Sequence, residues 1–314
     1  MTKNFVFIVS GGRTGTNFFG TTLGQVITDC FSVHEPDALV DPRKFGWKKT
    51  ISQFQTFGVR HMIIDRVLKK SGIRNLAQQF LNGDYNDDNS ILIQNIRAHR
   101  EKYHASISES LIVESYFQWF GLLPVLRSVY PQAKVVGVIR DPRTWVQSRI
   151  NYRGQHDKSD WIKLLGQSRL TPAMVNDHEY ANEWNSMTVF QKLCWDWKIT
   201  YELIESFAKA DPLCSLYKFE DLFESGSTKE RLDLFKFITE HGHKTYKYDL
   251  EADVFSTRHN TSKGNSNIWQ NWSDEDIAFL KNLCGPIMEK HGYGLEPQWI
   301  ERSNQSSSPM QIAV

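Results

Sequence analysis

The sequence feature that most constrains the fold is a short apolar run, FVFIV at residues 5–9, which leads directly into the glycine-rich segment SGGRTGTNFF at residues 10–19. An apolar run without polar alternation is typical of a strand buried on both faces of a parallel sheet. Glycines permit a sharp turn from such a strand into a helix, and a helix N-terminus presents main-chain N–H groups to an anion. The segment therefore predicts a phosphate-binding turn at the end of a first, buried strand.

Further apolar runs predict more strands of the same sheet. Segments with helical periodicity lie between these runs, and strands that alternate with helices form a parallel sheet covered on both faces. We therefore expect an α/β fold, a parallel β-sheet flanked by helices, with ligands at the carboxyl ends of the strands. The runs are LIVE at 111–114, KVVGVI at 134–139 and LCSLYKF at 213–219.

The chain is expected to form one domain over residues 1–300. Two long helical segments, at about 41–107 and 151–210, are interpreted as insertions that cover the site. Within the second, the aromatic residues of 184–197 have helical spacing and are expected to belong to the core. The polar, serine-rich residues 301–314 are expected to form a flexible tail.

Composition restricts the classes of partner and the compartment. The net charge of +1 argues against a nucleic-acid-binding protein, which depends on a dense basic surface. We expect no membrane span, because no stretch approaches the roughly 20 apolar residues that one requires, and the first apolar run is too short for a signal peptide. Four scattered cysteines indicate reduced thiols in a cytoplasmic protein, with no metal site. Five histidines without a ligand-like arrangement are expected to be exposed: His61, His99, His104, His241 and His243.

The glycine-rich turn lacks the lysine of a nucleoside-triphosphate loop. Instead Arg13 supplies charge, and Thr14, Thr16 and Asn17 supply side-chain donors beside the main-chain N–H groups of residues 13–17. The alternative is a glycine turn with a threonine cap and no ligand.

A second segment, VVGVIRDPRTWVQS, predicts another anion site. Arg140 ends a buried strand, Asp141 suits an N-cap, and Pro142 suits the first helical position. Ser148 lies about two turns into that helix, so Arg140 and Ser148 could hold a second phosphate apart from the first. The alternative is a capped helix with a surface arginine. Two separated phosphates are typical of 3′-phosphoadenosine 5′-phosphosulfate (PAPS), which carries a 5′- and a 3′-phosphate.

In these two segments and in two others, the sequence resembles the PAPS-dependent sulfotransferases. GGRTGTNFF resembles the 5′-phosphosulfate loop of that family, and RDPRTWVQS resembles its 3′-phosphate motif. LYKFEDLF resembles its RYEDL segment, with Phe219 in the place of a tyrosine and without that residue's hydroxyl. NTSKGNSNIWQNWSDEDIAFLKNLCGPIMEKHGYG resembles its C-terminal nucleotide-closing stretch. Arg13 and the residues around Lys263 are closer to the Golgi and bacterial carbohydrate or protein branch than to the cytosolic small-molecule branch.

The resemblance implies a P-loop, nucleotide-kinase-like sulfotransferase fold with helical insertions, PAPS as donor, its bisphosphate PAP as product, and no metal. The acceptor is expected to be a hydroxyl, on a carbohydrate in preference to a lipid, a natural product or a tyrosine. The residues implied in nucleotide binding are Gly12, Arg13, Thr14, Gly15, Thr16, Asn17, Phe18, Arg140, Ser148, Phe219, Arg258, Ser262, Lys263 and Gly264.

The acceptor hydroxyl needs a base, and the expected source is FSVHEPDAL at the end of a second strand. HEP resembles the YEP segment of the Golgi-type branch, whose glutamate is the base, which favours Glu35. The small-molecule branch uses a histidine, which keeps His34 as the alternative. Adjacent residues of an extended chain point to opposite sides, so only one of them is expected to face the acceptor.

Two further side chains, Glu114 and Ser115, end another predicted strand. They either position Glu35 or the acceptor, or Glu114 is a buried carboxylate paired with a helix end. Two rival functions remain at this point. One is a kinase-like phosphotransferase that uses ATP, and the other is a non-catalytic nucleotide- or glycan-binding protein on the same scaffold.

Overall fold

The structure is a computed structural model, and its backbone is described over seven ranges. These are residues 2–38, 47–68, 70–85, 88–151, 170–224, 227–249 and 269–306.

The centre of the fold is a parallel five-stranded sheet with the strand order β2-β3-β1-β4-β5. β1 lies in the middle and pairs with β3 on one side and β4 on the other. This confirms the expected parallel α/β architecture. The bounds of four strands also agree with the apolar runs: β1 Asn4–Ser10, β3 Leu111–Ser115, β4 Lys134–Ile139 and β5 Cys214–Lys218. The fifth strand, β2 Cys30–His34, is the second strand expected before Glu35.

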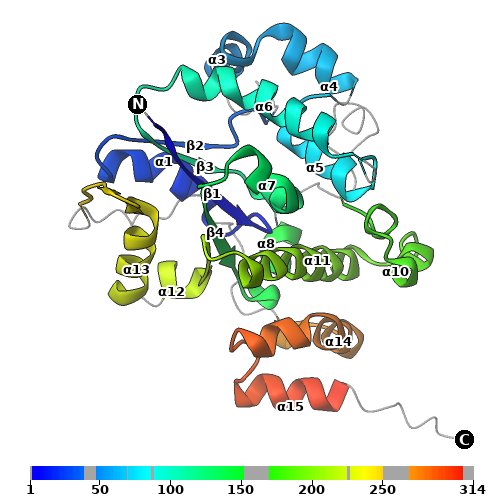
Figure 1. Cartoon of the computed structure of the whole chain (residues 1–314). Helices are drawn as coiled ribbons and strands as arrows, with labels where there is room; N and C mark the ends of the chain where they lie inside the picture. The colour runs from blue at the N-terminus through cyan, green and yellow to red at the C-terminus, as the bar shows by residue number, and fades with distance from the viewer. Residues whose placement is uncertain are drawn as a thin grey trace, which may run out of the picture.

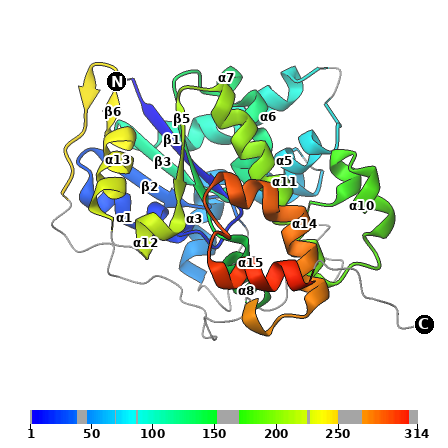
Figure 2. The same cartoon turned by 90° about the horizontal axis from the view of Figure 1, so that it is seen from below.

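Helices cover both faces of the sheet, as Figures 1 and 2 show. Alternate residues of β1 point to opposite faces, so Val6 and Ile8 pack against one layer while Phe7 and Val9 pack against the other. The first layer contains α1 (Thr16–Val26), α12 (Phe219–Phe223) and α13 (Thr228–Thr239). The second contains α7 (Leu123–Val129), α8 (Pro142–Asn151) and α11 (Val189–Ala210).

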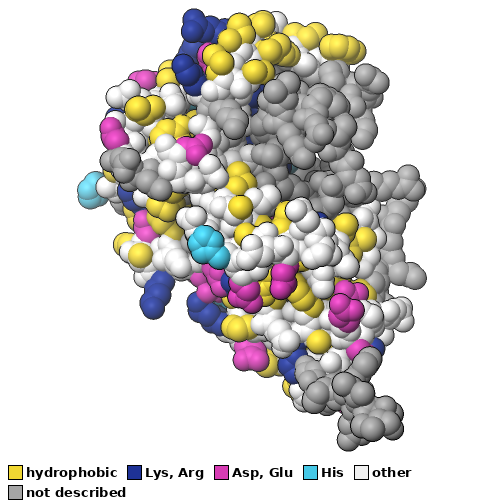
Figure 3. Space-filling view, turned by 90° about the vertical axis from the view of Figure 1, so that its right-hand side faces the viewer, with side chains coloured by type: hydrophobic (Ala, Val, Ile, Leu, Met, Phe, Trp, Pro, Cys, Tyr) yellow, Lys and Arg dark blue, Asp and Glu magenta, His cyan; other side chains and the backbone are white. Residues whose placement is uncertain are grey.

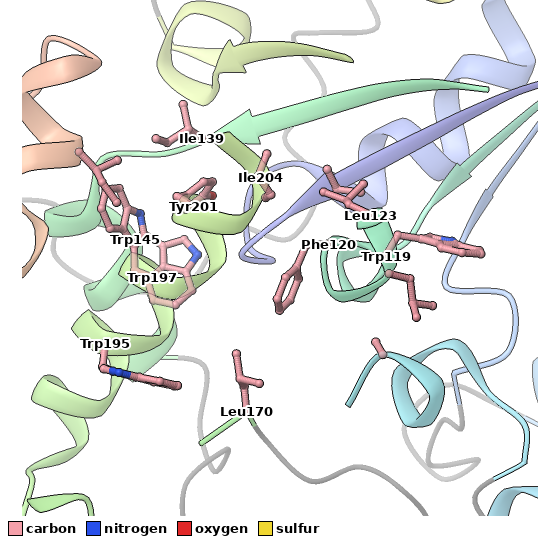
Figure 4. Packing of buried hydrophobic residues seen from close by; sticks show 14 of the residues in the cluster. Trp119, Phe120, Leu123, Ile139, Trp145, Leu170, Trp195, Trp197, Tyr201 and Ile204 are labelled. Atoms are coloured by element: carbon pink, nitrogen blue, oxygen red, sulfur yellow. The ribbon is translucent and has the colours of Figure 1, made fainter. Parts of the chain in front are cut away.

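The second layer has an aromatic core beside the carboxyl ends of the strands (Figure 4). Trp145, Trp195, Trp197 and Tyr201 are all fully buried. Two of them, Trp195 and Trp197, belong to the aromatic stretch 184–197, for which the predicted core role is confirmed. The expected cover over 151–210 is wrong for α11, which belongs to this core and packs against α8, α14 (Asp274–Lys290) and β5. Residues 152–169 of that segment lie outside the described residues.

The segment before β3 is helical, as expected, and forms a cap on the sheet. Its first part exposes a row of large apolar side chains at the top of the molecule (Figure 3): Val59, Ile63, Ile64, Val67 and Leu68. The elements of the cap are α3 (Trp47–Phe57), η1 (Arg60–Ile64), α4 (Asp65–Val67), α5 (Ile73–Leu81) and α6 (Ser90–Ala105).

The remaining elements are short apart from one long helix near the C-terminus. No helix of the ranges above is long and apolar enough to cross a membrane. The elements are η2 (Phe117–Leu122), η3 (Pro172–Val175), α10 (His178–Glu183), β6 (Glu240–His241), β7 (Lys244–Thr245), η4 (Trp269–Asn271), α14 (Asp274–Lys290) and α15 (Pro297–Ser306).

The flexible tail expected from residue 301 also needs a correction. Helix α15 continues to Ser306, and it buries Trp299 and Ser303. The pairing of one aromatic and one small side chain four residues apart gives this polar helix a narrow packing face. The rest of the expected tail, residues 307–314, lies outside the described residues.

Candidate functional site

Two of the predicted motifs, the glycine turn and the segment that begins at Arg140, lie where the order of the sheet reverses. The chain leaves β1 towards β2 on one side, and later places β4 on the other side of β1. Ligands of open parallel sheets bind at such a point, beyond the carboxyl ends of the strands. The glycine turn follows β1 here, and Arg140 follows β4.

The glycine turn has the strained backbone that its sequence suggested. Gly12, Arg13 and Gly15 all have positive φ, at 74°, 57° and 78°. A positive φ is costly for a residue with a Cβ, so Arg13 is an outlier of the kind that clusters at functional sites. Gly15 is doubly required, because a Cβ there would lie 2.7 Å from the ring of Phe223.

The rear of the turn is anchored to the core by side chains. The Trp145 indole Nε1–H donates to the Gly12 carbonyl oxygen at 2.7 Å. The Tyr201 hydroxyl accepts from the Gly11 N–H at 3.3 Å and donates to the Val138 carbonyl at 2.9 Å. These bonds join α8, α11 and β4 to the turn, so its conformation is set by the core.

The front of the turn is open. The main-chain N–H groups of Thr14, Gly15, Thr16 and Asn17 have no hydrogen-bond acceptor among the residues of the described ranges. The Thr14 hydroxyl is fully buried and also lacks a partner there. Buried polar groups are normally paired, so five unpaired donors at one helix N-terminus fit an anionic ligand.

The second predicted motif touches the first. Arg140 donates from Nη1 to the Arg13 carbonyl oxygen at 2.9 Å, and the Arg13 Nε donates to the Ser148 hydroxyl at 3.3 Å. The Arg140 guanidinium lies 4.4 Å from the centroid of the Phe219 ring. The two motifs, which the sequence suggested would stand apart, therefore form one continuous surface with two arginines.

The start of α8 is capped as predicted. The Asp141 carboxylate accepts from the Arg143 N–H at 2.8 Å. The Asp141 N–H in turn donates to Glu220, whose other oxygen accepts from the Tyr293 hydroxyl at 2.7 Å. Burial raises the pKa of Glu220 and lowers the pKa of Arg140, although nearby carboxylates partly oppose the second shift.

The candidate bases are close together, contrary to the expectation that they point to opposite sides. Glu35 has a positive φ of 45°, which turns its side chain back so that Oε1 lies 4.0 Å from the His34 Nε2. Both side chains are about one quarter exposed, at 22% and 24%. The Glu35 N–H donates to the Ser115 carbonyl at 3.1 Å, which fixes this turn to the end of β3.

Glu35 also precedes Pro36, and a residue before proline normally adopts an extended conformation. Its positive φ is therefore strained on two grounds. A turn of this kind persists only where its surroundings hold it in place. The residue that holds it is Asp37, two positions further along the chain.

Asp37 is the centre of a buried charge cluster that sequence analysis missed. Its carboxylate accepts from His99 at 2.5 Å and from the Ile73 N–H at 2.9 Å, and lies 3.4 Å from Arg100. Burial opposes ionisation, but Arg100, His99 and Arg66 outweigh it and hold the pKa of Asp37 well below its ordinary value. The turn after β2 is thereby fastened to the helical cap.

Glu114 belongs to the same cluster and is buried, as one alternative expected, but its partners are the side chains of Arg100 and Trp119 in place of a helix end. It accepts from Arg100 at 2.8 Å and from the Trp119 indole at 2.7 Å. The prediction of exposed histidines is wrong for His99 and His104, which are 2% and 4% exposed. Both lie on the inner face of α6, a helix whose amphipathic pattern is weak because its buried face is charged.

A pocket lies beside the glycine turn, between the cap and the second helical layer. Arg74 and Arg149 line it from α5 and α8, with Asp196 on α11 near the latter. Its other walls are apolar or carry amides: Leu81, Phe117, Phe120, Leu170, Gln78 and Gln118, with Gly11 and Thr200.

Of the other residues expected to contact the nucleotide, some are described by the structure and some are not. Thr16 and Phe18 are buried in the first turn of α1, and Asn17 lies between them, partly buried. Arg258, Ser262, Lys263 and Gly264 lie outside the described residues. Sequence analysis missed Tyr201 and Arg74, which have no local motif and reach the site only through the fold.

Comparison with known proteins adds no family assignment. No family model matches the chain, and no curated protein matches it either. The geometry described above is therefore what any functional assignment has to explain: a fixed turn with open donors, two arginines, and a carboxylate beside a histidine.

Proposed function

We propose that this protein is a PAPS-dependent sulfotransferase that transfers a sulfuryl group to an acceptor hydroxyl. The observation that carries the proposal is the glycine turn, whose rear is bonded to the core while the N–H groups of residues 14–17 and the Thr14 hydroxyl are unpaired within the described chain. A donor set of this kind suits a 5′-phosphate at a helix N-terminus.

The surroundings of the turn support a nucleotide with more than one phosphate. Arg13 and Arg140 bring two positive charges to the same edge, and Ser148, on α8, accepts a hydrogen bond from the Arg13 Nε. We assign Arg140 and Ser148 to the 3′-phosphate and the open turn to the 5′-phosphosulfate. The strand order, with the turn after the central strand, is compatible with a nucleotide-kinase-like fold.

The proposed chemistry is an in-line displacement at sulfur. The acceptor oxygen forms a bond to sulfur while the bond from sulfur to the bridging oxygen of the 5′-phosphate breaks. The electron pair of that bond goes to the bisphosphate, where Arg13 stabilises the developing charge. As in phosphoryl transfer, positioning and charge stabilisation supply most of the rate enhancement.

Glu35 is assigned as the base that removes the proton of the acceptor hydroxyl. Its carboxylate is partly exposed and follows β2, on the same edge of the sheet as the turn. The His34 Nδ1 lies 3.2 Å from the Ser115 carbonyl, which only accepts, so this nitrogen carries the proton. The His34 Nε2 lies 4.0 Å from the Glu35 Oε1, and His34 remains the alternative base. We further propose that the acceptor is a carbohydrate, on the basis of the family resemblance. The proposed cytoplasmic location rests on the scattered cysteines.

The proposal is tested by thermal unfolding with PAP, beside ATP with magnesium. A ligand at about 100 times its dissociation constant adds roughly 2.7 kcal/mol to the free energy of unfolding. We expect PAP to raise the melting temperature and ATP with magnesium to leave it unchanged. Stabilisation by ATP with magnesium alone would instead support a kinase-like phosphotransferase.

A further inference from the structure

We propose that the apolar row of the helical cap binds the surface of a lipid bilayer that contains anionic lipids. This interaction is separate from the proposed transferase reaction, because the row includes no residue of the glycine turn, the two arginines or the candidate bases. The cap lies at the end of the molecule opposite α15, so the bilayer would contact that end only (Figure 1). The row consists of Val59, Ile63, Ile64, Val67 and Leu68.

The first observation is that η1 and α4 have the reverse polarity of an ordinary surface helix. Their inner face buries Met62 and the charged side chain of Arg66. Their outer face is apolar and at least 40% exposed, in two pairs with four-residue spacing: Ile63 with Val67, and Ile64 with Leu68. A helix in water normally exposes its charges and buries its apolar side, so this orientation favours an apolar environment for the outer face.

The second observation is that hydrogen bonds on the inner side hold this orientation. The Arg66 Nη2 donates to the Asp37 carbonyl oxygen at 2.6 Å, and the Asn75 side-chain amide donates to the Arg66 carbonyl at 3.1 Å. The Ser71 hydroxyl donates to the His61 carbonyl at 2.6 Å. The outer side chains therefore cannot turn inward unless these bonds break, and the apolar surface exists before any partner binds.

The third observation is the concentration of exposed apolar side chains in this part of the protein. Residues 47–68 hold seven of the thirteen exposed large hydrophobic residues of the described chain. Two of the seven, Trp47 and Ile51, lie one turn apart on α3, and both are more than half exposed. Figure 3 shows apolar side chains gathered at the top of the molecule, beside lysine and arginine side chains. Soluble proteins rarely expose such a patch unless it binds a protein or a membrane.

The charge around the patch favours a membrane. Residues 47–70 contain six lysine or arginine residues and one acidic residue, Asp65, in a chain whose net charge is only +1. Lys48, Arg60 and Lys70 are exposed. Tryptophan, aliphatic side chains and basic residues together are typical of surfaces that lie in the membrane interface, where the basic residues attract anionic headgroups. Lysine is depleted from protein–protein interfaces, so a bilayer fits this composition better than a protein partner does.

A second copy of the chain fits the patch less well than a bilayer. In a symmetric dimer the same surface faces itself, which would bring Lys48, Arg60 and Lys70 of one copy near those of the other. Like charges at close range oppose association. Anionic lipids would instead neutralise all of these side chains.

The test is co-sedimentation of the full-length protein with vesicles of phosphatidylcholine, alone or mixed equally with phosphatidylserine. We expect binding to the mixed vesicles to be about tenfold tighter than to phosphatidylcholine, and to weaken as the salt concentration rises. Ile64→Gln with Leu68→Gln should weaken binding about tenfold or more, because less apolar area enters the bilayer. Leu295→Gln with Ile300→Gln is the matched control, since both side chains are exposed at the opposite end of the molecule, and it should bind like the wild type.

Charge reversal tests the contribution of the basic residues. Lys48→Glu with Lys70→Glu should weaken binding to the mixed vesicles about tenfold or more. Lys209→Glu with Lys229→Glu should leave it unchanged, because these two exposed lysines belong to α11 and α13 and not to the cap.

Several outcomes would overturn the proposal. They are failure to bind the mixed vesicles, equal binding by the wild type and the folded variant at residues 64 and 68, and binding that does not distinguish the two kinds of vesicle. Self-association that replaces vesicle binding and requires residues 64 and 68, measured by light scattering, would assign the surface to a second copy. PAP binding, measured in parallel, should be the same in all these variants, so the sulfotransferase proposal stands or falls independently of this one.

Discussion

Trp145 holds Gly12 from inside the core, through an indole hydrogen bond of 2.7 Å to the glycine carbonyl. The indole is fully buried, and its ring lies 3.2 Å from the position of a Cβ on Gly11. The glycine turn is therefore supported by the same aromatic cluster that stabilises the second helical layer. Loss of this hydrogen bond should therefore change the conformation of the glycine turn.

Trp145→Phe is expected to lower both stability and nucleotide affinity. The shorter ring leaves the Gly12 carbonyl unpaired and opens a small cavity, at a cost of about 1–3 kcal/mol. Urea unfolding and PAP titration measure the two effects. Trp195→Phe is the matched control, since its indole bonds to Asp177 at 2.8 Å, away from the turn. An equal loss of PAP affinity in both variants would contradict the anchoring role.

Gly15→Ala is expected to destabilise the protein more than Gly242→Ala. Both glycines have positive φ, but a Cβ on Gly242 meets nothing within 4 Å, whereas one on Gly15 meets Phe223 at 2.7 Å. The φ penalty alone is roughly 1–2 kcal/mol. The difference between the two variants in urea unfolding isolates the steric effect.

Phe223→Ala in the Gly15→Ala background tests that interpretation. If the ring is the obstacle, the two substitutions should be less destabilising together than the sum of their separate effects. Strict additivity would mean that the backbone conformation alone accounts for the requirement for glycine at this position.

Glu35→Gln is expected to reduce turnover about 10²- to 10⁴-fold, because the amide cannot accept the acceptor proton. PAP affinity should be unchanged, since the proposed nucleotide contacts lie at the glycine turn and at Arg140 and Ser148. Turnover that is unaffected in Glu35→Gln and lost in His34→Gln would transfer the role of base to His34. Retained nucleotide binding with no turnover on any hydroxyl, in the wild-type protein, would favour the non-catalytic alternative.

The free energy of unfolding is expected to fall as the pH drops from about 6.5 towards 4. Burial lowers the pKa of His99 to about 3 and that of His241 to about 4, so in this range the unfolded chain binds protons that the folded chain does not. Urea midpoints at pH 7 and pH 5 measure the effect. His99→Gln should weaken the pH dependence and the exposed His243→Gln should preserve it, while equal midpoints would contradict the prediction.

Sequence alone predicted the sheet well because its strands are buried on both faces. FVFIV and KVVGVI became β1 and β4 with boundaries within a residue of the runs. The capped start of α8 was also predictable, since Asp141 and Pro142 act locally. Features that depend on residues close together in the chain can therefore be predicted without knowledge of the fold.

Contacts between residues far apart in the chain were not predicted. Tyr201 reaches Gly11 across 190 positions, and His99 reaches Asp37 across 62, so neither pairing has a local pattern. His99 was expected to be exposed because a histidine on a polar helix normally is. The adjacency of His34 and Glu35 was missed because the positive φ of Glu35 reverses the alternation of an extended chain.

The turn that follows β2 gives two carboxylates opposite roles within three residues. Glu35 is partly open to solvent, while Asp37 is fully buried and neutralised by the cap. Substitutions at residue 35 would therefore change the proposed base while the tether at residue 37 keeps its buried ion pairs.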